Sequence, residues 1–237
     1  MSSSGFLNAL QAMELSQMCV QAIWDRDSPL KQIPGFTTEI IKRCVDANVE
    51  SVYDIMELED DDRDKLLKMD GRQMRDVARF CNAYPSIELA HEVEDPDNLS
   101  ADEPITLHIN LEREVDEDDA ATEAVVPAPF YPKRKIENWW LVVGDQETKQ
   151  LLSIKKVTVQ RRLKVKLDFT TSQGAHKLKL FFISDSYAGA DQVRTTAALL
   201  HYGGSVELTI GHVQEYDFTV DVAEGADSDE DSNEDDE

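Results

Sequence analysis

The spacing of apolar residues changes near residue 87, and this change divides the chain into two parts. Before it, apolar residues recur every three to four positions, which is typical of amphipathic helices. After it, they alternate with polar residues, which is typical of half-buried β-strands. The pattern therefore predicts an α+β protein, with a helical part followed by an antiparallel β part.

The helical part begins with a predicted helix over residues 6–24, which contains no Gly or Pro. A second helix is expected after Thr37, and the segments Ser51–Asp54 and Asp70–Gln73 have the residue spacing of helix N-caps. Short helices joined by Pro and Gly turns predict a helix-loop-helix module over residues 27–86. The first helix is then a separate element, over residues 1–26.

The β part contains seven strand candidates with turn signals between them, most with alternation and one, Asn138–Val143, as a continuous apolar run. They predict an antiparallel β-sandwich of immunoglobulin-like type over residues 87–222. Gly144–Asp145 and Gly174–Ala175 are expected in hairpin turns. One of the neighbouring Trp139 and Trp140 is expected at the centre of the core, with the other at or near the surface. The segments are Ile87–Val93, Ile105–Leu111, Asn138–Val143, Leu151–Val159, Leu163–Phe169, Leu178–Phe182 and Tyr216–Val222, and the Pro-containing stretch Val126–Pro132 is expected to cross a sheet edge.

The net negative charge of the chain argues against one class of binding partner, the nucleic acids. The 237 residues include 48 acids and 24 Lys or Arg, so the formal charge of −24 disfavours binding of nucleic acid by bulk attraction. Ten of the acids lie in residues 221–237, and a tail over 223–237 is expected to be disordered. Ser228 and Ser232 each precede an acid by three residues, so they are candidate phosphorylation sites. The alternative is a tail that only increases solubility.

Motifs for catalysis or metal binding are missing from the sequence. Cys19, Cys44 and Cys81 are far apart, which argues against a disulfide framework and a zinc site and fits a reducing compartment. The five histidines are scattered, and neither a phosphate-binding loop nor a nucleophile motif is present. The prediction is therefore no catalytic residue, no metal and no cofactor. No apolar run is long enough for a membrane helix.

One basic stretch stands out in this acidic chain. Its cations alternate with apolar residues, so they are expected on one exposed face of a strand. The simplest interpretation is a solvated face, and the alternative is a docking face for an acidic partner or for RNA backbone. The acidic run Glu57–Asp64 in the helical module favours a packing adaptor over nucleic-acid binding. The four candidate residues are Arg161, Arg162, Lys164 and Lys166.

Six segments form a specific series that follows the chain in order: Leu30–Phe36, Ile41–Cys44, Val49–Met56, Asp76–Asn82, Asn138–Asp145 and Lys164–Phe169. This series resembles one known family, the large spliceosomal RNA helicases of the DExH type. The resemblance is to the Sec-sixty-three homology unit at the C-terminal end of their second helicase cassette.

The resemblance implies an organisation and a role. In this family the unit combines a helical bundle, a helix-loop-helix domain and an immunoglobulin-like domain, so residues 6–24 would be the last bundle helix of a truncated unit. ATP hydrolysis and unwinding belong to motor domains that the resemblance does not cover. The implied role is a nuclear, non-catalytic region that binds spliceosomal proteins and its own helicase cassettes. The first helix has no basic residue before Arg26, which lowers the expectation of strand contact.

Residues 193–214 do not fit the resemblance. In the family a short turn would join Gln192 almost directly to Glu215, so Val193–Gln214 is expected to be a translated intron. Its codons can encode splice-site and branch-point signals in the right order. The alternative is a surface insertion, which loop-closure entropy tolerates. The start at Met1 is likewise expected to reflect truncation upstream.

Two other function classes remain open. The first is an RNA-binding accessory module that uses the basic strand face, with salt-dependent affinity. The second is a Sec-sixty-three-type component of protein translocation. That component would need membrane spans, and the sequence contains none.

Overall fold

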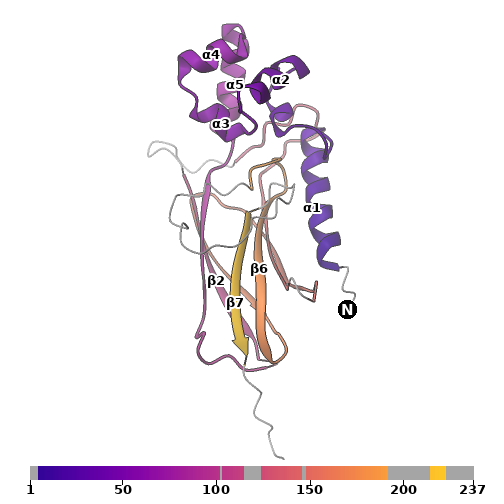
Figure 1. Ribbon diagram of the computed structural model, residues 1–237, viewed down its shortest axis with the longest axis vertical. Coiled ribbons are helices and arrows are strands. Elements are labelled where there is room, and N and C mark those ends of the chain that lie inside the picture. Colours follow the sequence, from indigo (N-terminus) through magenta and orange to yellow (C-terminus); the bar gives the residue numbers. More distant parts are fainter. Residues whose placement is uncertain (1–4, 102, 115–123, 146–147, 192–213, 223–237) are drawn as a thin grey trace, which may run out of the picture.

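The computed structural model describes residues 5–101, 103–114, 124–145, 148–191 and 214–222. The acidic tail with Ser228 and Ser232, and nearly all of the predicted insert, lie outside the described residues. Figure 1 shows an elongated molecule with the short helices gathered at one end, the strands filling the other, and the first helix lying beside the strands.

Five α-helices and a short 3-10 helix form the helical part. Thr37 caps one helix, while Ser51 with Asp54 and Asp70 with Gln73 form the two predicted capping boxes. The first helix ends at Gln21, earlier than predicted, because Ala22 adopts a left-handed conformation with φ 54°. The helices are α1 (Gly5–Gln21), η1 (Pro29–Gln32), α2 (Thr38–Asp46), α3 (Val52–Glu57), α4 (Asp60–Leu67) and α5 (Gly71–Ala83).

Seven strands form two antiparallel sheets, as the mixed α+β pattern predicted. One sheet has the order β1-β2-β5, and the other has the order β4-β3-β6-β7. The chain therefore crosses between the sheets after β2, β4 and β5. The strands are β1 (Ile87–Val93), β2 (Ile105–Arg113), β3 (Trp139–Asp145), β4 (Leu151–Val157), β5 (Arg162–Phe169), β6 (Gly174–Ser184) and β7 (Gln214–Val222).

Both expected glycine hairpin turns are wrong in detail. Gly144 and Asp145 belong to β3, where the pairing with β4 shifts between Val143 and Gly144, so this glycine marks a bulge and the turn comes later. Gly174 opens β6 with φ 123°, but β5 pairs with β2 while β6 pairs with β3. The link before Gly174 is thus a crossover between the two sheets. The prediction failed because alternation shows where a strand lies but not which strand it pairs with.

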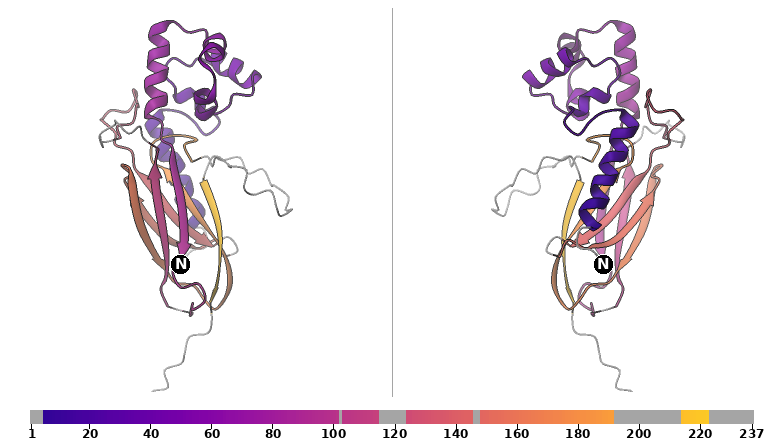
Figure 2. Two further views of the ribbon diagram at one scale, coloured as in Figure 1. Left: turned by 90° about the vertical axis from the view of Figure 1, so that its left-hand side faces the viewer. Right: turned by 90° about the vertical axis from the view of Figure 1, so that its right-hand side faces the viewer.

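The core lies between the two sheets. Trp139 is 1% exposed and stacks on Phe182 at a ring-centroid distance of 4.4 Å, while Trp140 is half-buried, as expected for the pair. Inward residues of β2, including Leu107, join the same cluster. The alternate residues of β3 face α1, which covers the outer face of the larger sheet; Figure 2 shows this helix running along the strands.

Trp139 is the largest fully buried side chain among the described residues, so its truncation should lower stability. We expect Trp139→Ala to lower the free energy of unfolding by about 3–5 kcal/mol, because the cavity lies in the stacked centre of the core. Urea denaturation of the whole chain measures this change. Trp24→Ala is the matched control, since that ring is 64% exposed, and it should change stability by less than about 0.5 kcal/mol. Equal losses for both variants would contradict this description of the core.

Candidate functional site

The turn that follows β6 contacts three parts of the molecule, which are α1, the helical module formed by η1 and α2–α5, and the two sheets. We call residues 184–191 the junction segment. From α1, Gln17 Nε2 donates to the Ser184 carbonyl at 2.8 Å, and Gln21 Nε2 donates to the Ser186 carbonyl at 2.8 Å. Both glutamines are buried, and they lie one helical turn apart on the face of α1 that covers the sheet. The amides thus tie the helix to the backbone of the sandwich.

Tyrosine hydroxyls tie the helical module to the same segment. Tyr53 Oη donates to the carbonyls of Pro85 at 2.7 Å and Ala190 at 3.2 Å. Tyr84 Oη donates to the Ala188 carbonyl at 2.9 Å. The three tyrosines Tyr53, Tyr84 and Tyr187 also pack edge to face, with neighbouring ring centroids 5.2 Å apart.

The third hydroxyl reaches in the opposite direction. Tyr187 Oη, from the junction segment, donates to the carbonyl of Ala83 at the end of α5, at 3.0 Å. Gln32 adds a two-way contact with Ala188, donating through Nε2 at 2.7 Å and accepting through Oε1 at 3.2 Å. Donors from both sides therefore satisfy the backbone of this turn, as buried polar groups require.

Asp185 is the ionic centre of the junction. Its carboxylate is 2% exposed and accepts from Lys135 Nζ at 2.6 Å, Lys156 Nζ at 2.8 Å and Ser186 Oγ at 2.5 Å. Burial acts to raise the pKa of Asp185, but the hydrogen bonds from Lys135, Lys156 and Ser186 outweigh it, and the pKa lies below its usual value. Asp185 is therefore a charged group held by two cations.

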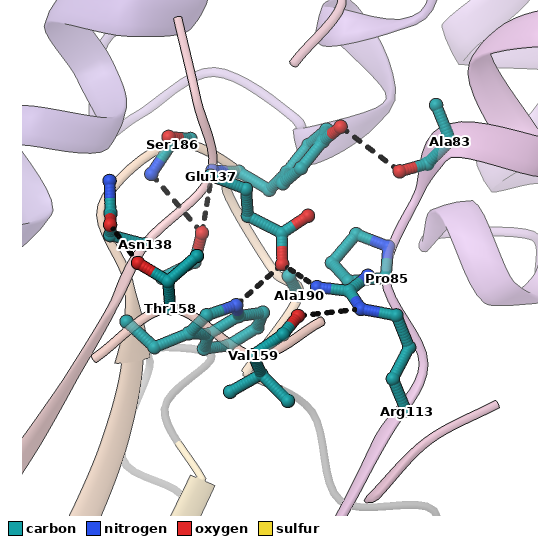
Figure 3. A network of polar contacts seen from close by, with 12 residues as sticks. Ala83, Pro85, Arg113, Glu137, Asn138, Thr158, Val159, Ser186 and Ala190 are labelled. Carbon is teal, nitrogen blue, oxygen red and sulfur yellow. Dashed lines mark hydrogen bonds and ion pairs between the residues drawn. The ribbon is translucent and has the colours of Figure 1, made fainter. Parts of the chain in front are cut away.

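Glu137 is a second buried carboxylate, and Figure 3 shows it close to the end of the Arg113 side chain. Its Oε1 accepts from Trp139 Nε1 at 2.6 Å and forms an ion pair with Arg113. Arg113 Nε also donates to the Val159 carbonyl at 3.1 Å. Burial raises the pKa of Glu137 even though Arg113 opposes this effect. The pair thus links β2, the loop before β3 and the strand link after β4.

Asp191 closes the junction segment and has the opposite electrostatic environment to Asp185. It accepts from Ser184 N at 2.8 Å and Gln17 Nε2 at 3.0 Å, without a cation in contact within the described residues. Burial raises the pKa of Asp191 well above its usual value. The neutral form of this carboxyl is thereby favoured.

The contacts at the junction segment were not predicted from the sequence. One signal for it existed, because Gln17 and Gln21 interrupt the apolar face of the first helix at a spacing of four residues. Polar residues on a buried face need partners. Those partners are backbone carbonyls more than 160 residues away, which no local pattern reveals.

The basic strand residues lie where the alternation predicted. Arg162, Lys164 and Lys166 are exposed on β5, and Arg161 is exposed immediately before it. Register with β2 places Glu112 opposite Arg162, and their side chains form an ion pair at 2.5 Å.

A second acid, Glu94, pairs with a cation at the other end of the four basic residues, which we call the basic row. Glu94 Oε2 lies 3.4 Å from Lys166 Nζ and 2.9 Å from His108 Nε2. The hydrogen bonds from His108 and Lys166 hold the pKa of Glu94 below its usual value. Two of the four predicted cations are thus paired, and the row remains a prediction as a binding face.

Within the described residues, no group of metal-ligating side chains comes together, and the three cysteines are free thiols. No helix in that part of the chain is long and apolar enough to cross a membrane.

Two antiparallel sheets, a cluster of short helices and a polar junction between them define an α+β structural module. The Sec63 Brl domain family matches residues 1–197, and the chain belongs to this family. It is 47% identical over 234 residues to the U5 small nuclear ribonucleoprotein 200 kDa helicase of Homo sapiens, covering 98% of this chain and 10% of that protein.

Other relatives agree with this assignment. The protein of the same name from Drosophila melanogaster is 51% identical over 194 residues, which is 81% of this chain and 9% of the relative. The pre-mRNA-splicing factor brr2 of Schizosaccharomyces pombe is 45% identical over 193 residues, again 81% and 9%. The chain thus spans about a tenth of the length of the relatives that it matches.

The hydroxyl of Tyr187 can be tested separately from its ring. We expect Tyr187→Phe to lower the free energy of unfolding by about 1–2 kcal/mol, because the partly buried Ala83 carbonyl loses this donor while the ring stays. Thermal and urea unfolding measure the loss. Tyr131→Phe is the control, because the Tyr131 hydroxyl makes no hydrogen bond within the described residues; a similar loss there would sink the interpretation.

Asp185 predicts a pH dependence of stability. Because its pKa is lower in the folded state, its contribution is present above the unfolded-state pKa and is lost as the pH falls through the folded-state value. We expect Asp185→Asn to cost about 2–3 kcal/mol at pH 7, after allowance for the partial exposure of Lys156. The gap between wild type and variant should close below the usual carboxyl pKa.

Urea unfolding at a series of pH values measures this gap. Asp168→Asn is the matched control, because Asp168 is exposed and contacts only the Thr106 hydroxyl among the described residues, so its effect should be small at every pH. A gap for Asp185→Asn that stays constant down to strongly acidic pH would contradict the assignment.

Proposed function

We propose that this chain is a non-catalytic protein-interaction region at the C-terminal end of a spliceosomal DExH-type RNA helicase. It acts in pre-mRNA splicing in the nucleus, as part of a small nuclear ribonucleoprotein. Membership of the Sec63 Brl domain family and identity to relatives named as helicases and splicing factors support this proposal. Its partners are spliceosomal proteins and, in the parent, its own helicase cassettes. The parent hydrolyses ATP, whereas this region does not.

The observation that carries the proposal is the junction segment. Buried donors from α1 and from the helical module converge on residues 184–191, and Tyr187 of this segment donates back to Ala83, so hydrogen bonds join three structural parts. A rigid composite surface binds a partner without the entropic cost of ordering separate domains. Such a surface suits a docking platform.

The finer fold assignments belong to this proposal. The strand orders β1-β2-β5 and β4-β3-β6-β7, with crossovers between two facing sheets, support an immunoglobulin-like sandwich. Four short helices between residues 38 and 83, three of them with a side-chain N-cap, support a helix-loop-helix module. The predicted boundaries at residues 26, 86 and 222 are retained with these assignments.

RNA binding by the basic row is the alternative. Pairing of Arg162 with Glu112 and of Lys166 with Glu94 weakens it, because a paired cation gains less from a phosphate. Arg161 and Lys164 carry most of what remains. The translocation alternative shares the family name, but the relatives described above are named for splicing and helicase roles.

The proposed function predicts two results for the purified chain. ATP turnover should not exceed that of a mock preparation, with or without RNA. Immobilised chain should retain spliceosomal proteins from nuclear extract, as identified by mass spectrometry, and retention should survive RNase treatment.

Charge reversal separates protein docking from RNA binding. A variant with Arg161→Glu and Lys164→Glu should retain the same spliceosomal proteins as the wild type, because both side chains are exposed and outside the junction. Loss of retention on RNase treatment or on charge reversal would favour the RNA-binding module. Failure of the wild type to retain any spliceosomal protein would contradict the proposed function.

A further inference from the structure

A loop before β3 presents an unusual surface. We call residues 126–135 the knob loop. Its base is closed by an antiparallel bridge between Val125 and Ile136 and by a hydrogen bond of 3.0 Å from Val126 N to the Lys135 carbonyl. Val126 is 5% exposed and belongs to the core, so the sandwich fixes the base of the loop.

The loop exposes a large apolar side chain. Phe130 is 80% exposed, which is the highest value among the large apolar residues that the structure describes. Three prolines, Pro127, Pro129 and Pro132, restrict the backbone around it, and Tyr131 N donates to the Ala128 carbonyl at 3.1 Å in a turn. The ring is therefore presented by a backbone that has little freedom left to lose on binding.

A cleft of about 330 Å³ lies beside the loop. Its walls are mainly apolar. They come from Pro127, Ala128 and Pro129 of the loop, from Pro34 and from Phe80 of α5. The Asp76–Arg79 ion pair lies at the same cleft. An exposed aromatic ring next to an apolar hollow resembles the anchor-and-pocket pattern of binding hot spots.

The charge around the loop is opposite to that of the whole chain. Residues 124–136 contain Lys133, Arg134 and Lys135 and no acid, whereas the chain carries −24. Lys135 is engaged by Asp185 in the junction. Lys133 and Arg134 are exposed three and four residues after Phe130, and Arg134 also interacts with another group of the chain. Their charge would attract an acidic partner and steer its approach.

We propose that the knob loop docks an acidic protein segment that carries an apolar side chain, with Phe130 as the anchor and Lys133 and Arg134 as the charge partners. The inference rests on the proposed function and names the surface and the partner chemistry for it. RNA fits less well, because the cleft is built largely from Pro, Ala and Phe side chains. A single aromatic ring also offers no platform for successive bases.

Site-specific crosslinking tests this docking surface in the full chain. Benzoylphenylalanine replaces Phe130, and the chain is irradiated in nuclear extract, with the same substitution of Trp24, which is 64% exposed, as the control. Mass spectrometry identifies the crosslinked peptides. We expect peptides at position 130 that are net acidic around an apolar residue, and we expect Lys133→Glu with Arg134→Glu to abolish the adduct.

A synthetic copy of the crosslinked peptide then measures affinity by fluorescence anisotropy. Phe130→Ser should raise Kd at least about tenfold, and Trp24→Ser should leave it unchanged. Added salt should weaken binding to the wild type. Both substituted rings are exposed, so neither variant should lose the fold, and far-ultraviolet circular dichroism checks this.

The outcomes separate this inference from the proposed function. An RNA adduct at position 130, a crosslinked peptide without excess acid, or no adduct above the Trp24 control would overturn the docking surface. If the wild type still retains spliceosomal proteins in those cases, the proposed function stands without the knob loop. If it retains none, the proposed function fails first.

Discussion

The backbone of the turn after β6 must find hydrogen-bond donors, because its carbonyl groups lie between three packed parts of the molecule. Gln17 and Gln21 supply donors from the first helix, and Tyr84 supplies one from the helical module. A buried carbonyl without a donor would cost about 1–3 kcal/mol. The arrangement of helices on the sandwich therefore depends on a few side chains whose geometry is directional, in contrast to the non-directional apolar core.

The junction segment contains two buried carboxyl groups whose pKa values are shifted in opposite directions. Asp185 stays charged because two lysines and a hydroxyl reach it, whereas Asp191 has amide donors around it and burial disfavours its charge. Their neighbours contribute to this difference, because two lysines reach Asp185 and no cation contacts Asp191 within the described residues. Lys135 belongs to the junction and also to the base of the knob loop, so the ionic centre positions the loop as well.

Surface charge has a different meaning at the two basic sites. On β5, strand register brings Glu112 beside Arg162, and Glu94 lies beside Lys166, so the row is partly neutralised. In the knob loop the distant Asp185 engages Lys135, and Lys133 and Arg134 are exposed in a segment whose prolines also restrict the backbone around the exposed Phe130. A charge count along the chain cannot distinguish these cases, because compensation is decided by residues that are distant in sequence.

The sequence by itself determined the elements of this protein. Period and capping patterns located the helices, as at Ser51 and Asp70. Alternation located most of the strands and a continuous apolar run located β3, because these signals depend on neighbouring residues. Only the tertiary structure decided which strands pair, where Gly144 and Gly174 lie, and which donors reach the turn after β6. The physical reason is that hydrogen-bond partners and ion pairs across long sequence separations are fixed by packing, which leaves no local pattern in the chain.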